Sequence, residues 1–300
     1  MAPTQRHRWL TLPDSHDRTR RAELIRYVHD QARGDFEARY PGVQFGPVVA
    51  VIAAYDEEQN IGAVLKAMPA FVDGLEVTTL VVVDGGTDAT AQVALDSGVF
   101  TCVLPVNLGH GQALKLGYEL ASAHGARYVV TLDADGQNDP AEMGNLIQPV
   151  IDGEADFVIA SRRLGVDRTT DRFRRAGVSL YASILNAIMS QELTDSSNGY
   201  RAFRVELLDD ILPLLVEDQY QTAEVVITAS SRGWRITERP TVWHPRASGT
   251  SKKGGNLFFG LQYGRVIGAT WYRTTRANRV RPPAPGSGDP GRSEPLSTDR

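Results

Sequence analysis

An unbroken apolar run near the start of the main fold reads Val48-Val49-Ala50-Val51-Ile52-Ala53-Ala54. It is rich in β-branched residues and lacks polar alternation, which is typical of a strand buried on both faces of a parallel sheet. Further strand and helix patterns alternate along the chain, with strands near 80–83, 99–104, 128–132 and 157–160 and helices near 58–69, 88–97, 110–124 and 141–152. This alternation predicts right-handed βαβ units and an α/β fold with a Rossmann-like, mostly parallel sheet flanked by helices.

The rest of the chain divides into segments by composition. Residues 1–45 are polar, with one weakly amphipathic helical pattern, and predict an N-terminal accessory helical segment. The main domain is expected over 46–250, followed by an amphipathic C-terminal helix over 251–278. Residues 279–300 contain five prolines and no aromatic residue, which predicts a disordered tail. The second half of the main domain shows helical patterns near 174–190, 204–215 and 222–232 and short strands near 234–243.

The composition excludes several classes of protein. The chain has 300 residues, a formal net charge of −4 and a pI of about 5.9, whereas a nucleic-acid binder normally carries a basic excess, so no nucleic-acid partner is expected. Cys102 is the single cysteine, which excludes an intrachain disulfide and fits a reducing, cytoplasmic location. The N-terminus has no apolar segment of signal-peptide length, and no apolar run reaches the roughly 18 residues of a transmembrane helix.

Two carboxylates, Asp133 and Asp135, directly follow the strand pattern at 128–132. In an open α/β sheet, ligands bind outside the carboxyl ends of the strands. Two carboxylates two residues apart in a turn can converge on one cation, and hard oxygen ligands suit Mg²⁺ or Mn²⁺, which complete their shells with water and substrate phosphates. The pattern also occurs in solvated turns, but its place after a buried strand favours a metal site.

Two earlier turns follow strand patterns in the same way. The turn Val83–Asp88 is either an ordinary capped connection to a helix, or a place where a nucleotide approaches two glycines while Asp84 meets its base or ribose. In the turn Ala53–Asn60, Tyr55 and its acidic neighbours either contact a nucleoside or place favourable charge at the start of a helix. Each turn by itself leaves both alternatives open.

Taken together, the three turns resemble those of the family 2 glycosyltransferases of GT-A fold, most closely the branch that includes dolichyl-phosphate mannose synthase. The likeness runs from Val48 to Lys252. Two departures stand out: Val83 occupies a position where an acidic residue commonly reads the base, and Ala53 replaces a proline. Seven short motifs carry the resemblance in order: Ala53-Ala54-Tyr55-Asp56-Glu57-Glu58, Val83-Asp84-Gly85-Gly86-Thr87-Asp88, Asn107-Leu108-Gly109-His110-Gly111-Gln112-Ala113, Asp133-Ala134-Asp135-Gly136-Gln137, Ala160-Ser161-Arg162, Asp195-Ser196-Ser197-Asn198-Gly199-Tyr200-Arg201-Ala202 and Gly249-Thr250-Ser251-Lys252.

The resemblance implies a single GT-A catalytic domain and an inverting, metal-dependent transfer from a nucleotide sugar, with GDP- and UDP-sugars as alternative donors. The cation, Mg²⁺ or Mn²⁺, neutralises the donor diphosphate. The metal ligands implied are Asp133, Asp135 and Gln137. The catalytic residues implied are Asp135, Arg201 and Asp195. The donor-binding residues implied are Ala53, Ala54, Tyr55, Glu57, Val83, Asp84, Asp133, Ala134, Gln137, Arg246 and Lys252.

Cationic residues downstream of the turn Asp133–Gln137 favour an anionic acceptor. A lipid phosphate is already an anion near neutral pH, so it calls for cations, whereas a hydroxyl acceptor calls for a carboxylate base. Arg175 and Ser179 have i,i+4 spacing on one helix face and match the pair that binds acceptor phosphate in the lipid-phosphate branch. Arg162 is a further expected phosphate contact, since a guanidinium binds phosphate through two hydrogen bonds.

A hydroxyl acceptor would need a base, and the candidates are Asp195 and Glu224. Each has a structural alternative, which is to orient Arg201 or cap local backbone, and we favour the structural role. The leading hypothesis is therefore transfer to a polyprenyl or dolichyl phosphate. The alternatives are a soluble glycosyltransferase acting on a sugar or small-molecule hydroxyl, and a non-catalytic nucleotide-sugar-binding homologue.

The aromatic and apolar stretch 256–273 bears on membrane contact. It is too interrupted to span a bilayer, and cations flank it on both sides. Such a helix either lies in the membrane interface or packs on the catalytic domain. With a lipid acceptor, the first alternative predicts peripheral contact with the inner face of the cell membrane.

Overall fold

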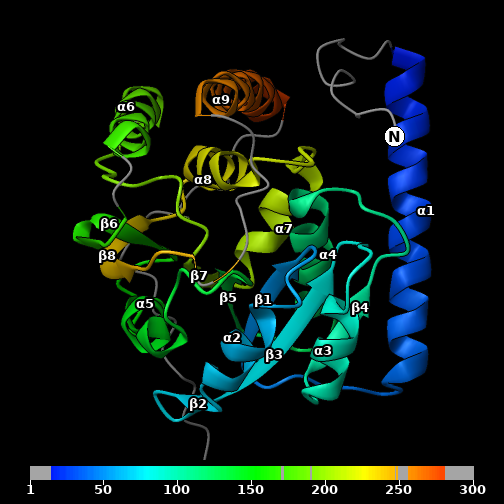
Figure 1. Ribbon diagram of the computed structural model, residues 1–300. Coiled ribbons are helices and arrows are strands. Elements are labelled where there is room, and N and C mark those ends of the chain that lie inside the picture. The colour runs from blue at the N-terminus through cyan, green and yellow to red at the C-terminus, as the bar shows by residue number, and fades with distance from the viewer. Residues whose placement is uncertain (1–14, 170–171, 190, 247, 249–255, 281–300) are drawn as a thin grey trace, which may run out of the picture.

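The computed structural model describes residues 15–169, 172–189, 191–246, 248 and 256–280. An eight-stranded sheet lies at the centre of this part, in the order β2-β3-β1-β5-β7-β6-β8 with β4 also paired to β3. Helices cover both faces of the sheet (Figure 1). The strands are β1 (Val48–Ala54), β2 (Phe71–Val72), β3 (Leu75–Val83), β4 (Phe100–Val103), β5 (Tyr128–Asp133), β6 (Phe157–Asp167), β7 (Arg201–Arg204) and β8 (Ile236–Trp243).

The predicted α/β class is confirmed, with a sheet that is parallel at its centre and mixed as a whole. Strands β4, β3, β1 and β5 are parallel neighbours, as the alternating pattern predicted. Strand β7 runs antiparallel between β5 and β6, and β2 is antiparallel to β3. The helices are α1 (Ser15–Arg39), α2 (Ile61–Ala67), α3 (Thr90–Asp96), α4 (His110–Ala123), α5 (Met143–Ile151), α6 (Arg172–Met189), α7 (Leu207–Ile211), α8 (Gln221–Ser231) and α9 (Asn256–Val280).

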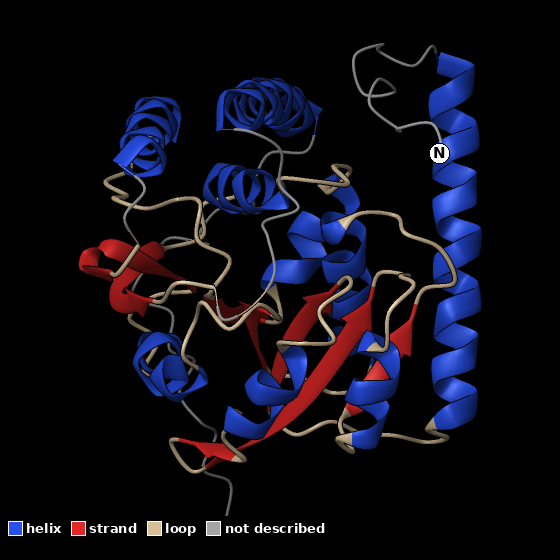
Figure 2. Ribbon diagram, viewed as in Figure 1, coloured by secondary structure: helices blue, strands red, loops and turns tan. Residues whose placement is uncertain are grey.

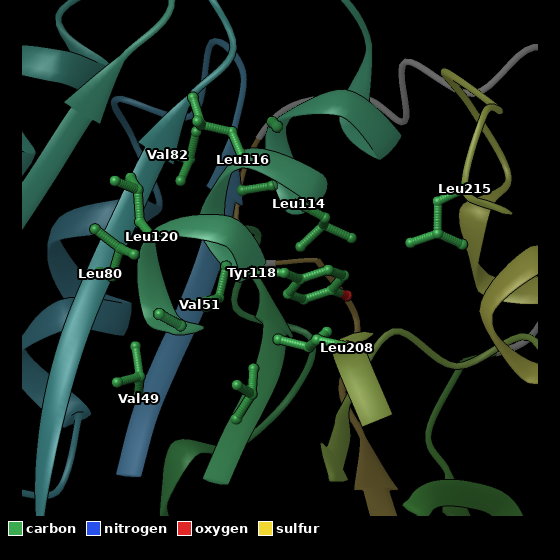
Figure 3. Packing of buried hydrophobic residues seen from close by; sticks show 14 of the residues in the cluster. Val49, Val51, Leu80, Val82, Leu114, Leu116, Tyr118, Leu120, Leu208 and Leu215 are labelled. Carbon is green, nitrogen blue, oxygen red and sulfur yellow. The ribbon is translucent and has the colours of Figure 1, made fainter. Parts of the chain in front are cut away.

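Strand β1 is buried along its whole length, as its sequence predicted. Successive side chains of a strand point to opposite faces, so its residues divide between two cores. Val49 and Val51 join the core that contains residues of α1, α4, α7 and α8, while Ala50 and Ile52 join the core formed with α2, α3 and α5. Figure 3 shows Val49 and Val51 facing the apolar side chains of α4.

Strand β7 was missed by the sequence pattern, which gave a loop to Arg201 and a helix near 204–215. The strand has four residues and begins and ends with arginine, so it shows no apolar run. Ala202 and Phe203 are nevertheless fully buried on opposite faces of the sheet, one in each core. The expected helix is correspondingly shorter: α7 begins at Leu207 and is followed by a 3-10 turn at Leu212–Leu214.

Three helices, α6, α8 and α9, lie together on the side toward which β1 and β3 run (Figures 1 and 2). They share a third apolar cluster, in which Leu185 of α6 and Ile227 of α8 pack with Tyr263 and Val266 of α9. The described part of the chain contains no helix long and apolar enough to cross a membrane. Of the predicted tail, 281–300 lies outside the described residues.

Candidate active site

The three acidic turns lie side by side because their strands are adjacent and in register. Ala54 of β1 pairs with Val83 of β3, and Ala53 pairs with Asp133 of β5. The strands are parallel, so their carboxyl ends meet at one edge of the sheet. The turns that were recognised separately in the sequence therefore form one site.

Hydrogen bonds lock the first turn to the second. Asp56 has a positive φ of 47°, and its Oδ1 accepts the backbone N–H of Thr87 at 3.1 Å. A Cβ on Gly86 would lie only 2.8 Å from that same oxygen. Glu58 Oε2 accepts the N–H of Ala89 at 2.9 Å. Gly86 thus leaves room for the Asp56 side chain of the neighbouring turn. This is a structural reason for glycine at position 86, in addition to the close approach of a nucleotide that the sequence suggested.

Asp84 is 2% exposed and lies beneath the turns. Its two carboxylate oxygens accept the backbone N–H groups of Leu108 and Gly109, at 2.8 and 2.9 Å. Burial raises the pKa of Asp84 to about 7, although those two hydrogen bonds oppose the shift. Val83 is buried as well. The structure therefore shows Asp84 holding the turn before α4, with both of its oxygens engaged by the protein.

Among the other residues expected to bind the donor, the alanines and the tyrosine differ in exposure. Ala53, Ala54 and Ala134 are buried, whereas Tyr55 is 39% exposed at the end of β1. The aromatic ring of Tyr55 is therefore accessible to a ligand at the carboxyl edge of the sheet.

The third turn, which follows β5, is organised by Asp135 and Gln137. Asp135 Oδ1 accepts the backbone N–H of Gln137 at 3.1 Å. The side-chain amide of Gln137 donates to the carbonyl of His244 at 3.1 Å, and the His244 N–H donates to the carbonyl of Gln137 at 2.9 Å. The turn after β5 is thus tied to the segment that follows β8, although about a hundred residues separate them in sequence.

Arg246 bridges the first and third turns. Its guanidinium is paired with Glu57 and lies 3.4 Å from Asp135 Oδ2, while its Nε donates to the Ser248 carbonyl at 3.0 Å. Glu57 is itself held by Asn60, whose Nδ2 donates to it at 2.7 Å. Glu57 and Arg246 were both expected near the donor, and the structure brings them into direct contact.

Asp133 is the last residue of β5 and lies next to α4 and to the loop before β7. Its Oδ1 lies 3.8 Å from Nε2 of His110, the first residue of α4. A Cβ on Gly199 would lie 3.1 Å from the same carboxylate, and Thr131 Oγ1 donates to the Gly199 carbonyl at 2.6 Å. The absence of a side chain at Gly199 lets the loop before β7 pass beside Asp133.

The donor groups at this edge fit a divalent cation. Asp133 and Asp135 keep side-chain exposures of 19% and 13%, so both carboxylates are reachable from solvent. Mg²⁺ needs one or two protein carboxylates and takes its remaining ligands from water and phosphate. The described residues hold no cluster of three His, Cys, Asp or Glu side chains suited to an all-protein metal cage. The arrangement therefore suits a cation shared with a phosphate ligand.

Arg162 and Asp195 form a buried, two-pronged ion pair. Arg162 Nε and Nη2 donate to the two oxygens of Asp195, at 2.5 and 2.7 Å, and the Arg162 backbone N–H adds a third bond at 3.1 Å. Asp195 is fully buried, and the guanidinium of Arg162 also lies over the ring of Trp243. This pairing holds the pKa of Asp195 below its usual range even though burial pushes it upward.

Arg201 is held by backbone carbonyls of the loop before β7. Orienting Arg201 was one of the structural alternatives given for Asp195 and Glu224; the described structure has Arg201 donating to the carbonyls of Asn198, at 2.8 Å, and Ser196, at 3.0 Å. It is 3% exposed, and its position in β7 places its guanidinium over the ring of Phe157. Burial lowers the pKa of Arg201. The side chain that donates to the Asp195 carboxylate from the neighbouring strand β6 is Arg162.

Glu224, the other base candidate, is also fully buried and fully engaged. It accepts the N–H groups of Val216 at 2.9 Å and Glu217 at 3.1 Å, and Arg273 of α9 donates to it at 2.6 Å. This is the backbone-capping role that we favoured from the sequence.

Two residues of the expected site fall wholly or partly beyond the described structure. Lys252 lies outside the described residues. Arg175 and Ser179 both belong to α6, which places them one turn apart on one helix, but the side chain of Arg175 is outside the described part.

The sequence profile described as Glycosyl transferase family 2 matches residues 49–212, which is more than half of the chain. The chain belongs to glycosyltransferase family 2. The matched region, 49–212, contains all three acidic turns and the Arg162–Asp195 pair.

Similar proteins support this assignment. A dolichyl-phosphate hexose transferase of Haloferax volcanii is 31% identical over 206 residues, which cover 69% of this glycosyltransferase and 86% of the relative. A polyprenol monophosphomannose synthase of Mycolicibacterium smegmatis is 29% identical over 223 residues, covering 69% and 81% of the two chains.

The solved structures show the GT-A fold. Glucosyl-3-phosphoglycerate synthase from Mycobacterium tuberculosis, in complex with Mn²⁺, uridine diphosphate and glucosyl-3-phosphoglycerate, has a TM-score of 0.59 and 22% identity. The match covers 80% of this glycosyltransferase and 83% of that chain. The expected fold is thereby confirmed.

Two residues beside the acidic turns, His110 and His244, were not among the expected site residues. His110 was not named among the expected site residues, although its place between two glycines at a helix start was the available signal. His244 was not considered, and nothing local marks it. Its proximity to Gln137 depends on how β8 leaves the sheet.

Proposed function

We propose that this glycosyltransferase moves a sugar from a GDP- or UDP-sugar to a polyprenyl phosphate with inversion, assisted by Mg²⁺ or Mn²⁺. The observation that carries the donor half is the placement of Asp133 and Asp135 at the end of β5, facing Arg246 and His110. Two carboxylates for a cation and two basic side chains for phosphate oxygens suit a nucleotide diphosphate. The solved fold neighbour that contains uridine diphosphate and Mn²⁺ is consistent with this pairing.

The proposed acceptor is inferred from the burial and the contacts of the two candidate bases. Asp195 and Glu224 are both fully buried, and each carboxylate is engaged by an arginine. A general base must reach the proton that it removes. Neither carboxylate meets this requirement in the described arrangement, which favours an acceptor that is already ionised. A phosphate monoester is such an acceptor, and relatives named for transfer to dolichyl phosphate or polyprenol phosphate agree.

The proposed reaction is a single displacement. An oxygen of the acceptor phosphate attacks the anomeric carbon from the face opposite the leaving diphosphate. The new carbon–oxygen bond forms as the bond to the nucleoside diphosphate breaks, and the nucleoside diphosphate departs as an anion. A bound divalent cation supplies neutralisation of that departing charge. Arg246 lies where it can add a second positive charge to the same oxygens, while Tyr55 offers an exposed ring to the nucleoside.

We also propose that α6 and α9 bring the enzyme to the lipid surface. Both helices expose large apolar side chains, and the two helices contact each other. The exposed apolar residues are Leu180 and Ile184 on α6 and Leu261, Trp271 and Tyr272 on α9. Arg265 and Arg276 are also exposed on α9, and aromatic residues beside cations suit the headgroup region of a bilayer.

A donor screen followed by a transfer assay tests the proposal. GDP- and UDP-sugars are first ranked by thermal shift with Mn²⁺ or Mg²⁺. The best donor, radiolabelled, is then offered to polyprenyl phosphate, to 3-phosphoglycerate and to a free sugar. We expect metal-dependent stabilisation and label in the lipid fraction alone. Transfer to a hydroxyl acceptor with none to polyprenyl phosphate would refute the acceptor assignment, and donor binding without any turnover would refute catalysis.

A further inference from the structure

The segment 215–220, which joins the 3-10 turn at Leu212–Leu214 to α8, lies between the C-terminal helix and the candidate active site. Glu217, at its centre, is 8% exposed. Arg265 donates to Glu217 at 2.7 Å and Arg273 donates at 3.1 Å, so two cations of α9 converge on one buried carboxylate. Arg273 also bonds Glu224, which caps the N–H groups of 216 and 217.

The other side of this segment contacts the first turn of α4. The carbonyl of Asp218 accepts the N–H of Gly111 at 2.8 Å, and its carboxylate accepts from Gln112 at 3.1 Å. Gln221 returns a bond to the Gly111 carbonyl at 2.8 Å. A Cβ on Gly109 would lie 2.5 Å from the Asp218 carbonyl oxygen, so the two backbones are in direct contact there.

The contacted turn, at the start of α4, contains His110. Gly109 and Gly111 flank the histidine, and a Cβ on Gly111 would overlap the carbonyl oxygen of Glu217. His110 in turn faces Asp133 at 3.8 Å. A continuous chain of contacts therefore runs from α9 through Glu217 and the α4 turn to the carboxylate at the end of β5.

We propose that Glu217 is a positioning residue for the donor site, through which α9 sets the place of the 107–111 turn and of His110 beside Asp133. The inference rests on the proposed function, since it assigns that function's donor site a remote support. Without the charge of Glu217, two arginines lose their common counter-ion, and the segment keeps only the link to α9 that runs through Glu224 and Arg273. The α4 turn is then free to shift, while Asp133 and Asp135 themselves remain unchanged.

The first test measures the coupling without any catalysis. Hydrogen exchange of the full chain is compared for the native protein, Glu217→Gln and the control Asp156→Asn. Asp156 is also buried and bonded to an arginine, with Arg235 Nη2 at 2.9 Å, but it lies at the opposite end of β6 from the site. We expect Glu217→Gln to speed exchange in 107–113 together with α9, by about tenfold or more, and Asp156→Asn to leave 107–113 as in the native protein.

The second test asks whether the coupling reaches the donor. For Glu217→Gln we expect KM for the nucleotide sugar to rise about tenfold while kcat changes by less than about threefold. Arg265→Lys should restore most of what Arg265→Met loses, because the ammonium keeps the charge opposite Glu217. Faster exchange confined to α9, or equal loosening of 107–113 in Asp156→Asn, would overturn the inference. A native enzyme without transferase activity would refute the proposed function alone, because the exchange result does not depend on it.

Discussion

The guanidinium of Arg246 lies 3.4 Å from Oδ2 of Asp135, although 111 positions separate the two residues in sequence. The same guanidinium is paired with Glu57. A cation that binds Asp135 must therefore share this carboxylate with Arg246, or displace it. A nucleotide diphosphate brings new negative charge, which gives both cations a partner.

Replacing Arg246 should separate metal binding from donor binding. In Arg246→Met we expect Mn²⁺ alone to bind several-fold more tightly, because a competing positive charge next to Asp135 is gone. The nucleotide sugar with Mn²⁺ should bind about tenfold more weakly, because one charge-assisted contact to phosphate is lost. Titration calorimetry with Mn²⁺, and then with donor, measures both. Arg246→Lys should stay near the native metal affinity, and weaker binding of Mn²⁺ in Arg246→Met would contradict this account.

Removing the carboxylate of Asp135 should abolish the response to metal. In Asp135→Ala we expect the donor to give no metal-dependent rise in Tm and transfer to fall by about a thousandfold or more, since leaving-group stabilisation is lost. Asp139→Asn is the matched control, because Asp139 belongs to the same loop, is exposed and caps the turn at 140–142. An Asp135→Ala enzyme that still responds to Mn²⁺ would place the metal elsewhere.

The Arg162–Asp195 pair should prove structural. Asp195→Asn leaves a buried guanidinium without a counter-charge, so we expect a loss of about 3–5 kcal/mol in urea unfolding. The double variant Arg162→Met/Asp195→Leu should recover a large part of that loss. If it folds and still transfers sugar with a native pH profile, neither side chain is a catalytic group. A stable double variant without activity would restore the assignment of Asp195 as catalytic and of Arg162 as a phosphate contact.

The anchoring of α1 should depend on pH through His29. Burial lowers the pKa of His29 from 6.5 to about 4, and the charges of Lys115 and Arg33 add to the effect while Asp30 opposes it. Glu119 lies 3.9 Å away but is paired with Arg33 at 2.6 Å. Between pH 4 and 6.5 the unfolded chain therefore binds more protons at this position than the native one, so stability falls as pH drops through that window.

His29→Leu should remove this part of the pH dependence. The native protein is expected to lose up to roughly 3 kcal/mol between the two pKa values from this residue. Urea unfolding at several pH values measures the slope for both proteins. An unchanged slope in the variant would show that other groups govern acid sensitivity.

The parallel part of the sheet and the turns after its strands were largely predictable, because local sequence patterns mark both. A buried parallel strand has a continuous apolar run, as β1 does, and ligand-binding residues follow such strands at their carboxyl ends. Residues 201–204 were predicted less well, because β7 forms through its pairing with β5 and β6 and shows no strand pattern of its own. Short strands with charged ends are recognised only once their neighbours are in place.

The sequence by itself determined the α/β class, the alternation of strands and helices that follows β1 and the position of Asp133 and Asp135 at a strand end. Local periodicity and strand-end placement suffice for each of these. Only the tertiary structure decided which charged side chains form ion pairs. These pairs are Arg162 with Asp195, Arg246 with Glu57 and Asp135, and Arg265 of α9 with Glu217. These partners lie between 33 and 189 residues apart. Their choice depends on sheet register and side-chain packing, which no local pattern contains.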